Sequence, residues 1–334
     1  MSSAVLPIAS SPQVSLLTID AASEGQRLDN FLLRVCKGVP KTHVYRIIRS
    51  GEVRVNKGRA QVDTRLAAGD IVRVPPIRLT DNASPEAAQQ QSGPAHTPPR
   101  EFPILFEDDY LLAINKPEGV AVHGGSGVSF GVIEQLRRAR RVGEPGGAKF
   151  LELVHRLDRD TSGILLIAKR RSALVNLQAQ FKARETGKTY LALVKGVWNP
   201  KLKVIDLPLH KYLVNGGDED GERRVKVVAK DDPNGMRSIT LVKVAKSIKL
   251  PTGDEASLLE VTIKTGRTHQ IRVHLAHHGH PILGDDKYGD FELNKLLAKV
   301  GMKRMYLHAW QLGFLHPASE QPTQLICDTR SEWV

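Results

Sequence analysis

A run of twenty-one residues, from Thr80 to Arg100, is too polar to take part in a hydrophobic core and divides the chain in two. It contains four prolines, three consecutive glutamines and no Val, Leu, Ile or Phe. Segments of this composition stay extended and cannot bury enough apolar surface to fold. The sequence therefore predicts a linker over residues 79–101, a small domain over 26–78 and a larger domain over 102–334, preceded by a flexible tail over 1–25.

Composition places the chain among ordinary globular proteins of a reducing compartment. Its 334 residues are 41 % hydrophobic and 25 % charged, close to the average for folded domains. The two cysteines, Cys36 and Cys327, are too few for a disulfide framework or a four-thiolate zinc site. The first basic residue is Arg27, so we expect no signal peptide, and no apolar run reaches the ~18 residues of a membrane span. We therefore expect a cytoplasmic protein.

Positive charge is concentrated in the small domain. The chain carries 48 Lys and Arg against 36 Asp and Glu, a net charge of +12. Twelve of the basic and four of the acidic residues lie within 26–78, so this segment contributes 12 − 4 = +8. Such an excess favours a polyanionic partner through counterion release and steering. The alternatives are a solvated charged face and a merely basic enzyme.

Apolar spacing predicts two short helices in this domain, one beginning at Leu28 and ending before Gly38, the other over 42–49. Strands are predicted around 53–55 and 71–74. The basic residues share the two helices and the turn that follows, an arrangement suited to phosphate contacts. The predicted contacts are Arg46, Arg49, Lys57 and Arg59.

The larger domain mixes strands and helices without regular alternation. Helices are predicted over 131–141, 171–184 and 268–278. Strands are predicted over 104–107, 110–115, 151–154, 163–168, 190–194, 225–229, 258–263 and 305–314. Strands outnumber helices and do not alternate with them, which predicts an α+β fold with a long mixed or antiparallel sheet and not a doubly wound Rossmann fold.

The segment from Val154 to Gly163 carries the first candidate for chemistry. An apolar strand runs into a dense charged stretch in which Asp158 lies between Arg156 and Arg159. Neighbouring guanidinium groups favour the ionised carboxylate, so Asp158 is a candidate anion and nucleophile. The alternative is a surface loop whose charges pair for solubility.

A second candidate is the segment from Lys264 to His274, in which a strand turns at Gly266 into a helix. Helix N-termini and basic side chains bind anions, either a substrate phosphate or a partner carboxylate. His274 and His278 would share a helix face, but a zinc site needs a third ligand and no cysteine lies nearby.

Two further stretches are weaker signals. The strand from Lys188 to Gly196 carries Tyr190 near its start, where a tyrosine is ordinarily a core residue with its hydroxyl hydrogen-bonded. Residues 124–127 are glycine-rich, but no Gly-Lys-Ser/Thr follows them, so they are a poor nucleotide-binding signal.

Taken in order, these motifs resemble a known family. The sequence from His155 to Gly163 resembles the signature of the RluA-type ribosomal RNA pseudouridine synthases, and the segments 188–196, 265–272 and 307–309 resemble its further motifs. The small domain is similar to the S-four-type RNA-binding domain. Residues 122–134 resemble the branch of the family that modifies the large-subunit ribosomal RNA. The resemblance covers residues 26–317 apart from the linker and implies the pseudouridine synthase fold.

The resemblance implies a role for five residues of the larger domain. Asp158 matches the catalytic aspartate of the family, and Tyr190 matches its active-site tyrosine, a candidate for proton transfer. Arg267 matches the basic residue that pairs with the aspartate. Arg156 matches the side chain that fills the space left by the flipped nucleotide, and His155 beside it is expected to contact RNA.

The resemblance also implies the partner and the cofactor requirement. It implies action on 23S ribosomal RNA or an assembling large ribosomal subunit, with neither a metal ion nor an organic cofactor, and we expect a monomer. Two other classes of protein stay open: a catalytically silent RNA-binding or ribosome-assembly protein on the same scaffold, and a metal-dependent RNA hydrolase built on the histidine cluster.

Overall fold

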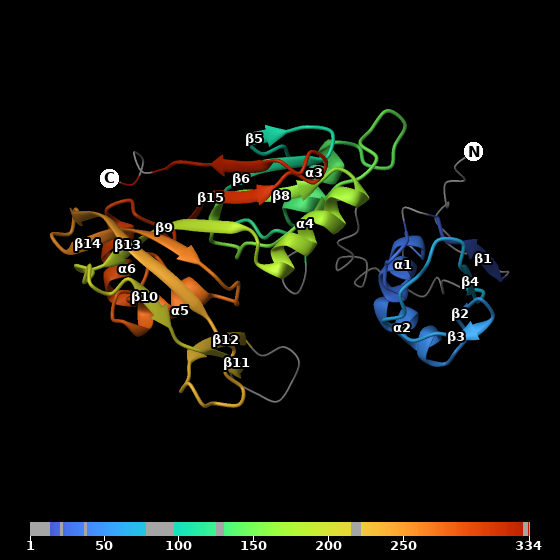
Figure 1. Ribbon diagram of the computed structural model, residues 1–334, viewed down its shortest axis with the longest axis horizontal. Coiled ribbons are helices and arrows are strands. Elements are labelled where there is room, and N and C mark those ends of the chain that lie inside the picture. Colours follow the sequence, from blue (N-terminus) through green and yellow to red (C-terminus); the bar gives the residue numbers. More distant parts are fainter. Residues whose placement is uncertain are drawn as a thin grey trace. The chain divides into compact units, whose positions relative to one another are not determined.

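The computed structural model describes residues 14–20, 23–36, 39–77, 97–124, 130–214, 222–329 and 333 (Figure 1). The chain divides into two compact units, residues 1–95 and 96–334, and the division falls within the predicted linker. Residues 79–96 of that linker lie outside the described part, as do residues 1–13 of the predicted tail.

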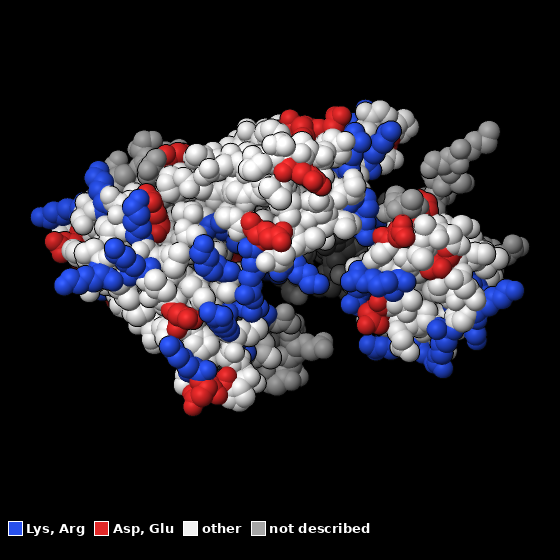
Figure 2. All heavy atoms as spheres, viewed as in Figure 1, with Lys and Arg blue, Asp and Glu red and all other residues white. Residues whose placement is uncertain are grey.

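The smaller unit packs two helices against a four-stranded antiparallel sheet. The helices are α1 (Leu28–Val35) and α2 (Lys41–Arg49). The strand order is β1 (Ser15–Thr18), β4 (Ile71–Val74), β2 (Arg54–Val55) and β3 (Gly58–Arg59). Apolar side chains at helical spacing, among them Leu28, Phe31 and Leu32 of α1, form its buried core. Lys and Arg side chains stand out on the surface of this unit in Figure 2.

Strand β1 corrects the predicted tail. Residues 15–18 pair with β4, with Leu17 opposite Val72, and Ile19 just beyond the strand is buried. The alternating exposure of residues 14–19 is that of an edge strand with one face on the core. The prediction of a flexible tail was therefore wrong for residues 15–18, because pairing with a strand more than fifty residues away leaves little local signal.

The larger unit is built on one long mixed sheet, as predicted. Ten strands of its described residues join in the order β10-β13-β14-β9-β15-β8-β6-β5, with β16 beside β15 and β7 beside β8. All pairs are antiparallel except β15 and β8. The strands are β5 (Ile104–Glu107), β6 (Leu111–Lys116), β7 (Glu152–Leu153), β8 (Ser162–Ala168), β9 (Gly187–Lys195), β10 (Val204–Asp206), β13 (Ile239–Lys249), β14 (Glu255–Ile263), β15 (Leu307–Leu315) and β16 (Pro322–Ile326).

The helices of this unit are α3 (Val132–Ala139), α4 (Arg171–Ala183), α5 (Gln270–His277) and α6 (Phe291–Lys299). A separate hairpin is formed by β11 (Leu209–Val214) and β12 (Glu222–Val227). The structure adds β10, β11, β13, β16 and α6 to the predicted elements. Helix α6 begins with a side-chain cap, because Asp290 accepts a hydrogen bond of 3.0 Å from the Leu293 amide.

Helices cover both faces of the sheet at β6 and β8. Ile164 and Leu166 of β8 pack with residues of α4, whereas Leu165 and Ile167 pack with residues of α3. Every residue of β8 is consequently buried. The continuous apolar run from Ile164 to Ala168 is the pattern expected of a strand with both faces in the core.

Two close contacts hold the loop between β7 and β8. Gly163 has a φ of +106°, and a Cβ built on it would lie 2.3 Å from the carbonyl oxygen of Ala309, so β8 and β15 can approach this closely only with glycine there. The Lys116 side chain is fully buried, and its Nζ donates to the carbonyls of Pro117, Val120 and Arg159 at 2.7–2.8 Å. These contacts fix the loop that carries Asp158.

Candidate active site

The predicted catalytic residues line one cavity of about 180 Å³ in the larger unit. Asp158 lies in the loop between β7 and β8, Tyr190 on β9, and Arg267 in the loop before α5. Arg156 also lines this cavity. The structure therefore brings together side chains that are more than one hundred residues apart in the sequence.

The cation that faces Asp158 is Arg272, on the first turn of α5. Arg272 Nη1 lies 3.6 Å from Asp158 Oδ2, and the two side chains are 3 % and 25 % exposed. The same guanidinium donates from Nε and Nη2 to the two oxygens of Asp285, each at 2.7 Å, and from Nη2 to Asp286 at 3.2 Å. Such a two-point contact fixes the plane of a guanidinium.

Arg267 does not occupy the predicted position. Its Nε donates to the carbonyl of Arg237 at 3.4 Å, and the structure gives it no ion pair with Asp158. Helix α5 begins at Gln270, so Arg267 precedes the helix whereas Arg272 extends from it toward the loop between β7 and β8. The prediction that Arg267 pairs with the aspartate was therefore wrong, although Arg267 lines the cavity.

A signal for Arg272 was present in the sequence. Arginine is almost never fully buried without a partner, and Arg272 stands between the apolar residues Ile271 and Val273 in a segment predicted to be helical. The partner, Asp285, follows a glycine thirteen residues later, and its side chain is only 1 % exposed. An arginine flanked by apolar helix residues predicts a carboxylate nearby, but its position cannot be read from spacing.

Burial and charge act in opposite directions on this pair. Burial, the largest effect on Arg272, lowers its pKa, but the hydrogen bonds and charge of Asp285, with the charges of Asp158 and Asp286, raise the pKa above its ordinary value. Burial likewise raises the pKa of Asp285, and the hydrogen bonds and charge of Arg272 reverse this and lower it. Both groups are therefore charged at neutral pH, and Asp158 faces a permanent cation.

A second group beside Asp158 is His269, which lies within the segment from Lys264 to His274 that the sequence analysis singled out. Its Nε2 lies 3.8 Å from Asp158 Oδ2, and its backbone adopts the left-handed conformation, with φ 51° and ψ 20°. His269 Nδ1 is 2.8 Å from the hydroxyl of Tyr288, which itself accepts a hydrogen bond of 3.0 Å from the Val225 amide.

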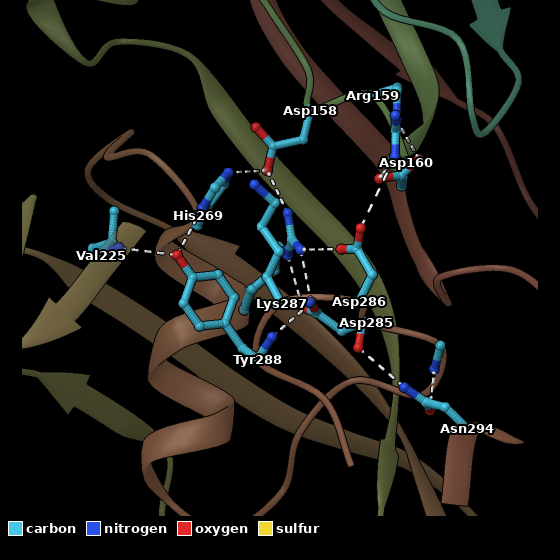
Figure 3. A network of polar contacts seen from close by, with 12 residues as sticks. Asp158, Arg159, Asp160, Val225, His269, Asp285, Asp286, Lys287, Tyr288 and Asn294 are labelled. Carbon is cyan, nitrogen blue, oxygen red and sulfur yellow. Dashed lines mark hydrogen bonds and ion pairs between the residues drawn. The ribbon is translucent and has the colours of Figure 1, made fainter. Parts of the chain in front are cut away.

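The position of the ring proton follows from the group beside Nε2. A carboxylate oxygen only accepts, so Asp158 favours the tautomer with its proton on Nε2, and Nδ1 then accepts from the hydroxyl of Tyr288, which itself accepts from the Val225 amide. Burial lowers the pKa of His269 more strongly than the charge of Asp158 raises it. The ring is therefore neutral and directs an N–H toward Asp158 (Figure 3).

Tyr190 presents a protonated hydroxyl to the cavity. Its partly buried ring packs against two of the hydrophobic clusters of the larger unit, and it lines the cavity with Asp158. Burial raises the pKa of Tyr190, and the negative charge of Asp158 raises it further. At neutral pH the phenol can donate a proton or a hydrogen bond, but it is not an anion.

His155 and Arg156 differ sharply although they are adjacent. His155 Nε2 accepts a hydrogen bond of 3.1 Å from the Leu166 amide, and its ring stacks on Phe181 at 4.7 Å. Burial lowers the pKa of His155 to about 4, so the ring is neutral and its contacts are to the fold. His155 also lines a cavity beside Arg156, and its RNA contact stays a prediction. Arg156, by contrast, is exposed at the edge of the cavity.

In the smaller unit, the four predicted phosphate contacts are all exposed. Arg46 and Arg49 lie on α2, Lys57 in the turn between β2 and β3, and Arg59 on β3. Arg59 Nη2 donates to the carbonyl of Arg49 at 2.8 Å, which brings the end of α2 and the hairpin together.

The histidines do not form the zinc site considered above. His274 is buried, with its ring nitrogens 2.9 Å from the Thr240 hydroxyl and 3.0 Å from the Leu207 carbonyl. Within the described part of the chain, His, Cys, Asp and Glu form no group of three or more that could hold a metal ion. No helix found there is long and apolar enough to cross a membrane.

Comparison with known proteins agrees with this arrangement. Residues 110–277 match the family described as RNA pseudouridylate synthase, and residues 26–72 match the S4 domain. The chain belongs to the RNA pseudouridylate synthase family. The resemblance inferred from the sequence motifs is thereby confirmed, as is the pairing of this fold with a small RNA-binding domain.

Relatives extend the match over almost the whole chain. The chain is 49 % identical over 306 residues to the ribosomal large subunit pseudouridine synthase C of Yersinia pestis, covering 92 % of this chain and 89 % of that protein. It is 47 % identical to the protein of the same name from Haemophilus influenzae, covering 91 % and 88 %. Among solved structures it is similar to human RNA pseudouridylate synthase domain containing 4, with a TM-score of 0.52, 30 % identity and coverage of 69 % and 89 %.

Proposed function

We propose that this chain converts specific uridines of the 23S ribosomal RNA into pseudouridine, in the cytoplasm, as a monomer and with its own side chains as the only catalytic groups. The observation that carries the proposal is a cavity in which the Asp158 carboxylate faces the buried cation of Arg272 and the phenol of Tyr190. The relatives named above, which are large-subunit enzymes, support the choice of RNA.

The reaction is an isomerisation, so no atom is gained or lost overall. The bond between uracil N1 and ribose C1′ breaks, the uracil rotates within the site, and a bond forms between C5 and C1′. C5 then loses its proton and N1 gains one. The site must therefore hold a free base while it turns, which requires an enclosed cavity with few fixed partners.

The target nucleotide has to leave its stack before it can reach Asp158. Unstacking and unpairing cost a few kcal/mol, which contacts to the RNA backbone can offset. Arg156 is placed for this step, because its exposed side chain stands at the edge of the cavity and is long enough to fill the space that the nucleotide leaves.

Asp158 supplies the anion for bond cleavage. Arg272 keeps a positive charge opposite it and directs the carboxylate, and the N–H of His269 approaches the same oxygen. Three routes are compatible with this geometry: addition of the carboxylate to ribose C1′, addition to the uracil ring, or removal of a ribose proton to form a glycal. Each of them uses the ionised carboxylate.

The protonated hydroxyl of Tyr190 suits the proton movements that follow. Its pKa is raised by burial and by Asp158, so it holds its proton until a basic atom of the substrate or intermediate comes close. Because Tyr190 and Asp158 line one cavity from different elements, the base and the sugar can be contacted at the same time.

The test is pseudouridine formation in a 23S ribosomal RNA transcript by wild-type protein and Asp158→Asn. The variant keeps the shape of the side chain but loses the anion, and we expect no product above background. Asp160→Asn is the matched control, since Asp160 lies in the same loop but pairs with Arg159 at 3.0 Å, and it should stay within several-fold of wild type. Near-normal turnover by Asp158→Asn would overturn the proposal.

The same assay separates the two other classes of protein. A silent RNA-binding or assembly protein would bind the transcript without making pseudouridine. A metal-dependent hydrolase would cleave the RNA and would lose activity after exhaustive chelation, whereas the proposed isomerisation should continue.

A further inference from the structure

A second cavity adjoins the catalytic one, and its charged lining is entirely basic. It encloses about 370 Å³ and shares Arg156, Tyr190 and Arg267 with the cavity of Asp158. It adds Lys182, Arg184 and Lys188. None of the described residues that line it is acidic, whereas the catalytic cavity contains Asp158 beside its cations. Figure 2 shows Lys and Arg side chains gathered below α4 and β9 on the face in view.

These cations come from several parts of the fold. Lys182 and Arg184 lie at the end of α4, Lys188 on β9, Arg156 in the loop before β8, and Arg267 in the loop before α5. The dipole at the C-terminus of α4 favours the first two by about 0.3–1 kcal/mol each. It does not account for the other three, so the cluster is more than a helix cap.

Lys188 shows that the cations are not neutralised locally. Its Nζ lies 5.2 Å from the centre of the Phe181 ring and donates to the Thr186 hydroxyl at 2.9 Å. Burial lowers the pKa of Lys188, and the charge of Arg184 lowers it further. A half-buried ammonium with only neutral or cationic neighbours is stabilised by an anion that enters the cavity.

Arg184 stands at a position where its backbone would favour glycine. It follows α4 in the left-handed conformation, with φ 64° and ψ 29°, which costs a side-chain-bearing residue roughly 1–2 kcal/mol. Its side chain is exposed and directed to the basic cavity, whereas the neighbouring Glu185 does not line it. A positively charged side chain therefore stands at a position where the backbone conformation favours glycine.

We propose that this basic cavity binds the phosphodiester backbone of the RNA strand next to the target uridine. The inference rests on the proposed function, because a uridine whose ribose lies at Asp158 carries a phosphate on each side within the polymer. At least one of these phosphates has to leave the catalytic cavity. The adjoining cavity offers it cations without a competing carboxylate.

Such a site positions the strand but does not read its sequence. Contacts to phosphate carry no base information, so the cavity contributes affinity and register and leaves specificity to other surfaces. Its loss should consequently raise KM and weaken the salt dependence of binding, with kcat little changed at saturating RNA.

The test uses full-length Arg184→Asn, Lys188→Gln and the double variant. Asparagine tolerates the left-handed backbone, so the first substitution removes charge without adding strain. Lys299→Gln, an exposed lysine in the last turn of α6, is the control for net charge. Binding to a 23S ribosomal RNA transcript is measured over a series of KCl concentrations, and pseudouridine formation is measured in parallel.

We expect the slope of log Kd against log salt to fall by about 0.7–0.9 for each lost phosphate contact in the single variants and by about 1.5 in the double variant. KM should rise by on the order of tenfold in the double variant, with kcat within about twofold of wild type. Lys299→Gln should match wild type in both measurements.

Unchanged slope and KM in the double variant, with normal product from wild type, would overturn this inference and leave the proposed function intact. Absence of product from wild type would overturn the proposed function, and the slopes would still decide whether the cavity binds RNA. Inorganic phosphate added at constant ionic strength should compete with RNA for the cavity and raise KM more in wild type than in the double variant. An equal effect of phosphate on both proteins would contradict the assignment of the cavity to RNA phosphates.

Discussion

Arg272 Nη1 lies 3.6 Å from Asp158 Oδ2, and the same guanidinium donates two hydrogen bonds of 2.7 Å to the carboxylate of Asp285. Asp285 also accepts the amides of Lys287 and Tyr288 at 2.8 and 3.0 Å, so the carboxylate that orients the arginine is itself fixed by the backbone. The cation facing Asp158 is therefore placed before any substrate arrives. Pre-organised charge of this kind costs no rearrangement during the reaction.

Arg272→Lys should lower kcat on the order of 100-fold, because an ammonium keeps the charge but cannot hold Asp285 at two points and still face Asp158. Arg267→Met, which removes a cation of the same cavity without touching this pair, should lower kcat by less than about tenfold. Single-turnover pseudouridine formation measures both, with circular dichroism to confirm that each variant is folded. A larger loss in Arg267→Met would contradict the assignment of Arg272.

Tyr288→Phe should lower kcat about tenfold, or ~1.4 kcal/mol, without changing RNA affinity. The substitution removes the proton donated to His269 Nδ1 and frees the ring to place its proton on either nitrogen. His269→Gln, which can still offer an N–H toward Asp158, should retain more activity than His269→Ala. Equal activity of Gln and Ala at this position would show that the N–H plays no part.

Tyr190→Phe should lower kcat on the order of 100-fold while binding RNA as tightly as wild type, because only the hydroxyl is lost and the ring still packs. The raised pKa of Tyr190 adds a second expectation. Between pH 7 and 9 the hydroxyl stays protonated, so the rate of wild type should not rise through its ionisation. A rising limb in this range that disappears in Tyr190→Phe would show that the phenolate is the active form.

Local patterns were sufficient to predict the elements but not the contacts between them. The apolar run of β8 predicts a buried strand, and the helical spacing of apolar residues in α4 predicts a helix. Each pattern lies within the element that it predicts. Which arginine pairs with Asp158 could not be predicted in this way, because Arg267 and Arg272 lie in the same short motif. It depends on the residue at which α5 begins and on Asp285, thirteen residues away in another loop.

The contacts of His269 were even less predictable from local sequence patterns. Its Nδ1 contacts the hydroxyl of Tyr288, which accepts from the amide of Val225, 63 residues earlier in the chain. Strand β1 likewise forms by antiparallel pairing with β4, which lies more than fifty residues later in the chain. Relations of this length depend on tertiary packing, and a single sequence carries no periodic signal for them.

Replacing Arg46, Arg49, Lys57 and Arg59 together by glutamine should weaken binding to a 23S ribosomal RNA transcript and flatten its salt dependence. All four are exposed and lie on α2 or in the β2–β3 hairpin, so the loss should be close to additive. If each contacts a phosphate, the slope of log Kd against log salt should fall by about 3. At saturating RNA, kcat should be unchanged. A slope equal to that of wild type would mean that these residues do not touch RNA.

His308 makes the fold sensitive to acid. Arg304 Nη2 donates to the Ser162 hydroxyl at 2.6 Å, which donates to His308 Nδ1 at 2.7 Å, and His308 Nε2 donates to the Cys327 carbonyl at 2.8 Å. A second ring proton would oppose the hydroxyl proton of Ser162. Burial, together with the charge of Arg304, lowers the pKa of His308 to about 4 against 6.5 when unfolded.

His308→Gln should therefore differ from wild type in the pH dependence of stability. Between pH 6.5 and 4 the unfolded chain binds a proton at His308 that the folded chain does not, so the free energy of unfolding falls as the pH falls through this window. At pH 5 the loss from His308 is about 2 kcal/mol relative to pH 7.5. Glutamine can accept from Ser162 and donate to Cys327 but does not titrate. In urea unfolding, the stability advantage of wild type over His308→Gln should shrink by about this amount between pH 7.5 and 5, whereas a constant difference would show that folding does not lower the pKa of His308.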